Sequence, residues 1–173
     1  PEHPFPAAID DTLAALRWAR AHAASLGADP SRVALGGDSA GGTLATVVSR
    51  ITAREGDPPA AQLLVYPATD SVTPRPSHVL FREGFFLDQR DRDDFARNYM
   101  RGVPVRGSDP RLSPLLAPDL GGLPPALVVV AGFDILRDEG DAYAAALAAA
   151  GNVVHTLRLP SLGHSFVNMT GIC

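Results

Sequence analysis

One serine in this chain has the sequence surroundings of a catalytic nucleophile. It lies in the motif Gly37-x-Ser39-x-Gly41, which follows a short apolar run and precedes a stretch with apolar residues at helical spacing. A serine on a tight turn between a strand and a helix can project its Oγ above the edge of a sheet. The glycines let the strand and the helix approach without clashes of Cβ atoms. The backbone N–H of Ala40, at the start of the helix, would then face an oxyanion formed beside Ser39.

The motif alone is not specific, because a chain with 16 glycines in 173 residues can contain it by chance. The alternative interpretation is an ordinary glycine-rich turn in which the serine caps the following helix. The catalytic interpretation gains support from the strand before the motif and the helix after it, and it requires a base and an acid elsewhere in the chain.

A histidine near the end of the chain is the predicted base. An activated serine needs an imidazole to take its proton and a carboxylate to hold that imidazole in the correct tautomer. Where the serine sits on such a turn, the order along the chain is Ser, acid, His, which leaves His155 and His164 among the five histidines. His155 lies within an apolar strand, whereas His164 follows the end of that strand. We therefore predict His164 as the base; the alternative is a histidine of a surface loop.

Two aspartates compete for the role of the acid. Asp134 comes shortly after the apolar run 126–131, and Asp70 follows an earlier apolar run. Catalytic groups in parallel sheets lie at the carboxyl ends of strands, which suits both. Asp134 is favoured because its strand is nearest in sequence to the strand that precedes His164. Three later acidic residues are explained as charges in the first turn of a helix: Asp138, Glu139 and Asp141.

The elements that must position these residues follow from the apolar pattern. Strands are predicted at 32–37, 61–66, 126–131 and 153–159. Helices are predicted at 10–26, 40–54, 88–100 and 138–150, with irregular structure at 71–87 and a connection at 102–125. Continuous apolar strands alternating with helices predict an α/β fold, with a mostly parallel sheet and helices on both faces.

Composition excludes several classes of partner. The net charge of −4 argues against nucleic acid or an anionic membrane as a partner. No apolar run is long enough to span a bilayer, so we expect no stable membrane insertion. The single cysteine, Cys173, excludes an intramolecular disulfide and a cysteine-based metal site. We expect neither a metal nor an organic cofactor; the oligomeric state stays open, and a cytoplasmic location is the working expectation.

Four motifs, in order along the chain, carry a resemblance to a known family. They are EHPFPAA at 2–8, GDSAGG at 37–42, GFDILRDEG at 132–140 and HSF at 164–166. Together they resemble the bacterial hormone-sensitive-lipase-type (family IV) carboxylesterases of the α/β-hydrolase superfamily. The resemblance implies a serine hydrolase that cleaves small carboxylic esters, of short- to medium-chain acyl groups, through an acyl-enzyme. It implies Ser39 as the nucleophile, Asp134 as the acid and His164 as the general base.

The chain departs from the family pattern in two ways. Ile135 stands where many relatives have proline, and the family's His-Gly-Gly-Gly loop, which supplies further oxyanion-binding N–H groups, is not found. The first strands and the N-terminal cap helices are not found either. We therefore expect residues 1–173 to be the C-terminal part of an α/β-hydrolase catalytic domain, weakly active or inactive alone. Within it, residues 71–101 are expected to line part of the pocket.

Two other functions stay open on the same residues. Amide or peptide hydrolysis would use the same three side chains, and only paired ester and amide assays separate it from ester hydrolysis. A non-catalytic ligand receptor of the same fold is the other alternative. It is disfavoured because receptors that resemble this superfamily lack the histidine, and His164 is present.

Overall fold

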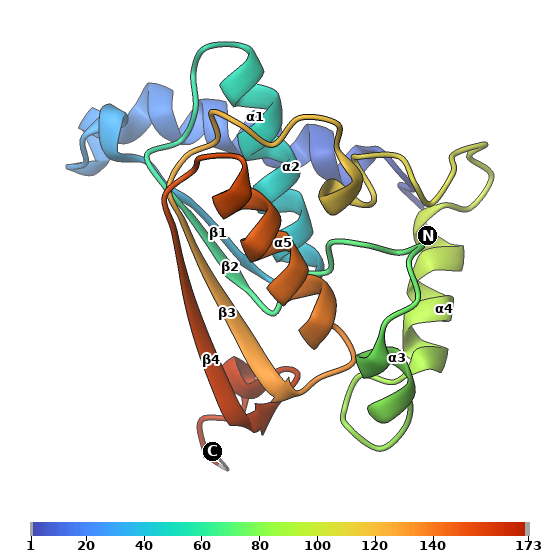
Figure 1. The fold of residues 1–173 in the computed structure, drawn as a ribbon. Coiled ribbons are helices and arrows are strands. Elements are labelled where there is room, and N and C mark those ends of the chain that lie inside the picture. Colours follow the sequence, from blue (N-terminus) through green and yellow to red (C-terminus); the bar gives the residue numbers. More distant parts are fainter. Residues whose placement is uncertain (1, 172–173) are drawn as a thin grey trace.

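Four parallel strands form the sheet on which the rest of the chain is arranged (Figure 1). The computed structural model describes residues 2–171. The strands are β1 (Leu35–Asp38), β2 (Gln62–Val65), β3 (Ala126–Phe133) and β4 (Val154–Gly163), and they lie in the order β1-β2-β3-β4. Each neighbouring pair is parallel. All four carboxyl ends therefore meet at one edge of the sheet.

Within residues 2–171, five α-helices connect or flank the strands. They are α1 (Ala7–His22), α2 (Ala40–Arg54), α3 (Pro76–Leu80), α4 (Gln89–Tyr99) and α5 (Arg137–Ala149). Short 3₁₀ segments lie at Ala23–Leu26, Pro30–Arg32, Pro114–Leu116 and Phe166–Asn168. The predicted α/β fold with a parallel sheet is confirmed, and each predicted strand and helix overlaps an observed one.

Helices α2 and α5 pack side by side against the same face of the sheet (Figure 1). Ala45 of α2 and Tyr143 of α5 share a buried cluster with Leu64 of β2 and Val128 of β3. The hydroxyl groups of Thr46 and Tyr143 are hydrogen-bonded to each other between the two helices. The main core of the domain therefore lies between this pair of helices and one sheet face.

Helix α1 extends the core by packing on α2. Ile9 and Leu16 of α1 contact Val47 and Val48 of α2, and all four side chains are buried. Phe5, just before α1, joins the same cluster.

The opposite face of the sheet is partly exposed. Leu63, Leu127 and Leu157 point to this face and are exposed by 42%, 39% and 47%. Within residues 2–171, helices therefore cover one face of the sheet. The apolar character of the strands had led us to expect helices on both faces. Both faces of these strands nevertheless carry leucine and valine side chains.

Two segments differ from the predicted elements. Helix α3 lies within 71–87, which was predicted to be irregular; it begins at Pro76, and Asp138 Oδ2 accepts a hydrogen bond from the N–H of Ser77 at 2.8 Å. This cap comes from a distant part of the chain, so local sequence does not reveal it. Strand β4 continues to Gly163, where a loop was predicted. Gly132 permits this pairing, since a Cβ there would lie 2.1 Å from the carbonyl oxygen of Pro160.

Candidate active site

Ser39 lies on the sharp turn between β1 and α2. Its backbone has φ 53° and ψ −120°, a conformation that is unfavourable for a residue with a side chain. Its N–H donates to the carbonyl oxygen of Val65 at 2.9 Å, which ties the turn to the end of β2. Gly37 is required, because a Cβ there would lie 2.3 Å from the carbonyl carbon of Gly41. The turn therefore has the strained geometry expected where a serine is presented above a sheet edge.

His164 follows β4 and reaches the serine. Its Nε2 atom lies 3.1 Å from Oγ of Ser39, and the side chain is almost completely buried. The next residue, Ser165, has φ 65°, a left-handed conformation that turns the chain immediately after the histidine.

Asp134 completes a chain of three hydrogen-bonded side chains. Its Oδ2 atom lies 2.8 Å from Nδ1 of His164, and its Oδ1 accepts the N–H of Leu136 at 2.8 Å. A carboxylate only accepts hydrogen bonds, so Nδ1 carries the proton and Nε2 is free to accept the hydroxyl proton of Ser39. This arrangement can remove a proton from a serine hydroxyl and hold the resulting imidazolium.

Asp70, the competing candidate, has other partners. Its Oδ1 accepts the N–H groups of Val72 and Thr73, and its Oδ2 forms an ion pair with Arg75 at 2.9 Å. Burial opposes ionisation, but the hydrogen bonds from Thr73, Val72 and Arg75 outweigh it and lower the pKa of Asp70. Asp70 therefore shapes the loop after β2, and the structure pairs Asp134 with His164 instead.

Ala40, the predicted source of an oxyanion-binding N–H, directly follows Ser39, whereas His155, the rejected candidate for the base, lies apart from the site. Ala40 is the first residue of α2, so no earlier turn of the helix accepts its N–H. His155 lies within β4 and is exposed, as expected for a strand residue outside the site.

Glu139 has a role that the sequence analysis missed. It was explained as a helix-terminal charge, but its carboxylate is fully buried. It accepts the N–H of Thr69 at 2.8 Å and lies 3.2 Å from Nε2 of His78 and 3.3 Å from a guanidinium nitrogen of Arg92. The helical spacing could have revealed it, because Glu139 lies four residues before Tyr143, on the buried face of α5.

Glu139 connects three segments around the site. The loop after β2, helix α3 and helix α4 all contribute partners of its carboxylate. Figure 1 shows α3 beside the start of α5, where this contact lies. The buried carboxylate therefore anchors much of residues 69–92 next to the loop that carries Asp134.

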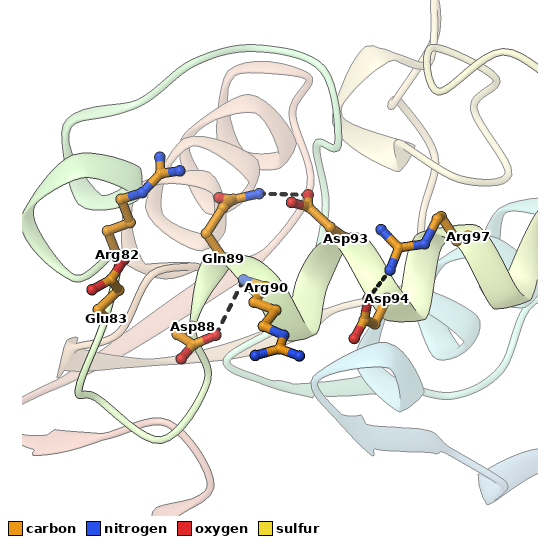
Figure 2. Close-up of a pocket in the computed structure, with 8 residues that line it drawn as sticks. All are labelled: Arg82, Glu83, Asp88, Gln89, Arg90, Asp93, Asp94 and Arg97. Carbon is orange, nitrogen blue, oxygen red and sulfur yellow. Dashed lines mark hydrogen bonds and ion pairs between the residues drawn. The ribbon is translucent and has the colours of Figure 1, made fainter.

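A charged cavity of about 530 Å³ lies along α4. Figure 2 shows its lining residues, which are Arg82, Glu83, Asp88, Gln89, Arg90, Asp93, Asp94 and Arg97. Several of them pair with one another: Gln89 with Asp93, and Arg97 with Asp94. The lining is polar and of mixed charge, and neither Ser39, Asp134 nor His164 contributes to it, so the cavity is a solvated surface feature.

Among residues 2–171, no group of three or more His, Cys, Asp and Glu side chains is placed to hold a metal ion. None of the helices in this part of the chain has the length and apolarity needed to cross a membrane.

Comparison with known proteins gives consistent matches over nearly the whole chain. A family model for the α/β-hydrolase fold matches residues 1–168. The carboxylic ester hydrolase LipN of Mycobacterium tuberculosis is 54% identical, over 98% of this chain and 46% of LipN. The carboxylesterase NlhH of the same species is 44% identical, over 97% of this chain and 54% of NlhH.

A solved structure is similarly close. It is an ester hydrolase from the metagenome of Lake Arreo, complexed with a derivative of bipyridine phosphonate. It has a TM-score of 0.93 and 50% identity, over 98% of this chain and 54% of that protein. The chain thus spans about half the length of the relatives that it matches.

Proposed function

Because this chain belongs to the α/β-hydrolase fold family, and to its hormone-sensitive-lipase type, we propose that the protein hydrolyses carboxylic esters with Ser39 as the nucleophile. The observation that carries the proposal is the unbroken hydrogen-bonded chain from Ser39 through His164 to Asp134. The names of the relatives, which are carboxylesterases and ester hydrolases, support the reaction class.

The first half of the reaction forms an acyl-enzyme. Oγ of Ser39 attacks the ester carbonyl carbon while Nε2 of His164 takes the hydroxyl proton. The carbonyl oxygen becomes an oxyanion, and the N–H of Ala40 stabilises it. The tetrahedral intermediate collapses with cleavage of the carbon–oxygen bond to the alcohol. His164 gives its proton to the departing alcohol oxygen, which leaves the acyl group on Ser39.

Water completes the cycle by the same route. His164 removes a proton from water, and the resulting oxygen nucleophile attacks the acyl carbon. Collapse of the second tetrahedral intermediate releases the carboxylic acid and returns the proton to Ser39. Asp134 stays ionised throughout and stabilises the imidazolium of His164 in both halves.

Residues 71–101 belong to the proposed substrate pocket. Phe81 and Leu87 are buried against Ile135 and Leu136, which directly follow the proposed acid. This packing places an apolar part of the segment beside the catalytic loop. The proposal extends to short- and medium-chain acyl groups, which a series of p-nitrophenyl esters of increasing chain length would rank by kcat/KM.

The proposal is tested with the full-length protein and Ser39→Ala. We expect turnover of p-nitrophenyl acetate or butyrate by the wild type and a loss of several orders of magnitude in the variant. A p-nitrophenyl phosphonate should label the wild type and not the variant. Ser108→Ala, which changes an exposed loop serine, should keep both properties.

Three results would contradict parts of this proposal. Turnover by Ser39→Ala close to that of the wild type would exclude Ser39 as the nucleophile. Cleavage of p-nitroanilides in preference to the matching esters would assign the protein to amide hydrolysis. Absence of both turnover and phosphonate labelling in a folded wild type would exclude a serine hydrolase.

A further inference from the structure

Tyr66 contacts the imidazole of His164 and takes no part in the hydrogen-bonded chain of the proposed triad. The centroids of the two rings are 4.5 Å apart, and their planes make an angle of 50°. Tyr66 is 2% exposed, so its ring is packed in the interior beside the imidazole. His164 thus has hydrogen-bond partners at both nitrogens and an aromatic ring against its side.

The backbone of Tyr66 is held in an unfavourable conformation. Its φ is 35°, in the left-handed region, and its N–H donates to the carbonyl oxygen of Val129 at 2.7 Å. Four non-glycine residues in the described chain have positive φ, and three of them belong to or adjoin the proposed triad: Ser39, Tyr66 and Ser165. Strained residues gather at functional sites because the surrounding structure forces a particular placement of the side chain.

The hydroxyl group of Tyr66 connects the ring to the turn that carries Ser39. It donates a hydrogen bond to Oδ2 of Asp38 at 3.2 Å, and Asp38 directly precedes Ser39. Burial and the charge of Asp38 raise the pKa of Tyr66, so the phenol stays a proton donor. Phe166 packs edge-on against the same ring, with centroids 5.3 Å apart.

Building on the proposed function, we propose that Tyr66 is a positioning residue for His164. The hydrogen bond from Nδ1 to Asp134 alone would leave the imidazole free to rotate about that bond. The ring of Tyr66 blocks this rotation, and its hydrogen bond to Asp38 fixes the ring relative to the turn that carries Ser39. Nε2 therefore stays directed at the serine Oγ. A displacement of about 1 Å at such a position costs on the order of 10²-fold in rate.

Two substitutions separate the ring from its hydroxyl group. Tyr66→Leu removes the ring, and we expect kcat for p-nitrophenyl butyrate to fall about 10²-fold with little change in KM. Tyr66→Phe keeps the ring and removes the link to Asp38, and we expect a fall of about two- to tenfold. The matched control is Tyr143→Phe, which removes the hydroxyl group of a second buried tyrosine, hydrogen-bonded to Thr46 in the helix core.

A second measurement does not depend on ester turnover. The Nδ1 proton of His164 that is shared with Asp134 should give a downfield proton resonance in NMR spectra. We expect this resonance to be sharp in the wild type and in Tyr143→Phe, and broadened or lost in Tyr66→Leu. A wild type without esterase activity would overturn the proposed function, while the resonance would still test the role of Tyr66.

The outcomes decide the role of Tyr66 even if one variant does not fold. If Tyr66→Leu is unfolded, Tyr66→Phe carries the test, since it changes neither the ring nor the packing volume. Equal losses of kcat in Tyr66→Phe and Tyr143→Phe would overturn the proposal, because they would indicate that loss of any buried tyrosine hydroxyl group impairs the packing of the protein. An unchanged kcat and an unchanged resonance in a folded Tyr66→Leu would overturn it, as would an effect on KM alone.

Discussion

The Oδ2 atom of Asp134 lies 2.8 Å from Nδ1 of His164, and the aspartate side chain is fully buried. The other carboxylate oxygen, Oδ1, is held by the N–H of Leu136. One oxygen thus fixes the aspartate in its loop while the other faces the imidazole. This division explains how a residue on a loop can set the tautomer and the direction of a neighbouring histidine.

Replacing Asp134, the proposed acid, should disable the proposed catalysis with little effect on the fold. Asp134→Asn keeps the size of the side chain but can donate to Nδ1, which favours the wrong tautomer of His164. We expect kcat to fall about 10⁴-fold in steady-state ester hydrolysis. Circular dichroism and thermal unfolding would verify that the variant is folded. If Asp70→Asn caused the larger loss of kcat, the acid would be Asp70.

Asp70 should instead affect stability in a pH-dependent way. Its hydrogen bonds and its ion pair with Arg75 lower its pKa from the usual value of 3.8 in the folded state. A lowered folded-state pKa adds stability above the usual value, and this stability is lost as pH falls toward the folded-state pKa.

The measurement is urea unfolding of the wild type and of Asp70→Asn at several pH values. The wild type should be the more stable protein at pH 7, and the difference should shrink as pH falls below about 4. A difference that stays constant from pH 7 to pH 3 would show that the carboxylate charge of Asp70 contributes nothing to stability.

The turn that carries Ser39 should tolerate a methyl group at Gly41 but not at Gly37. Gly37→Ala would place Cβ 2.3 Å from the carbonyl carbon of Gly41, a clash with backbone that cannot move aside. Gly41→Ala meets nothing within 4 Å, and alanine favours the helix by about 1 kcal/mol. We expect Gly37→Ala to be insoluble or to melt far below the wild type in differential scanning fluorimetry. Equal melting temperatures for the two variants would contradict this structure of the turn.

The buried carboxylate of Glu139 should contribute strongly to stability. Glu139→Gln leaves Arg92 beside a neutral group, and removal of one partner from a buried ion pair typically costs about 3–5 kcal/mol. The matched control is Glu55→Gln, which breaks the exposed ion pair with Arg17 and should cost at most about 1 kcal/mol. Chemical unfolding measures both changes. Similar losses in the two variants would show that the Glu139 cluster does not anchor α3 and α4.

Much of the architecture could be predicted from the order of apolar runs and helical patterns. Val128 and Val130 belong to a run that is apolar at every position, which is typical of a strand in a parallel sheet. The candidate site followed from the same pattern, because strands in a parallel sheet end at a common edge. Ser39, Asp134 and His164 each come shortly after such a strand, and the structure brings their side chains within hydrogen-bonding distance.

Tertiary structure alone decided the contacts that depend on distant segments. In helix α3, the N–H of Ser77 donates to Asp138, which lies 61 residues further along the chain. The choice between Asp70 and Asp134 depended on which carboxylate reaches the imidazole.

The sequence by itself thus determined the parallel α/β sheet and placed Ser39, His164 and two candidate aspartates after its strands, because periodicity and order along the chain can be read without the tertiary structure. The placement of Tyr66 against His164, and of Glu139 between His78 and Arg92, was decided only by packing. Burial and pairing depend on which segments meet in space. For a residue that belongs to no motif, such as Tyr66, a single sequence does not reveal which segments it will contact.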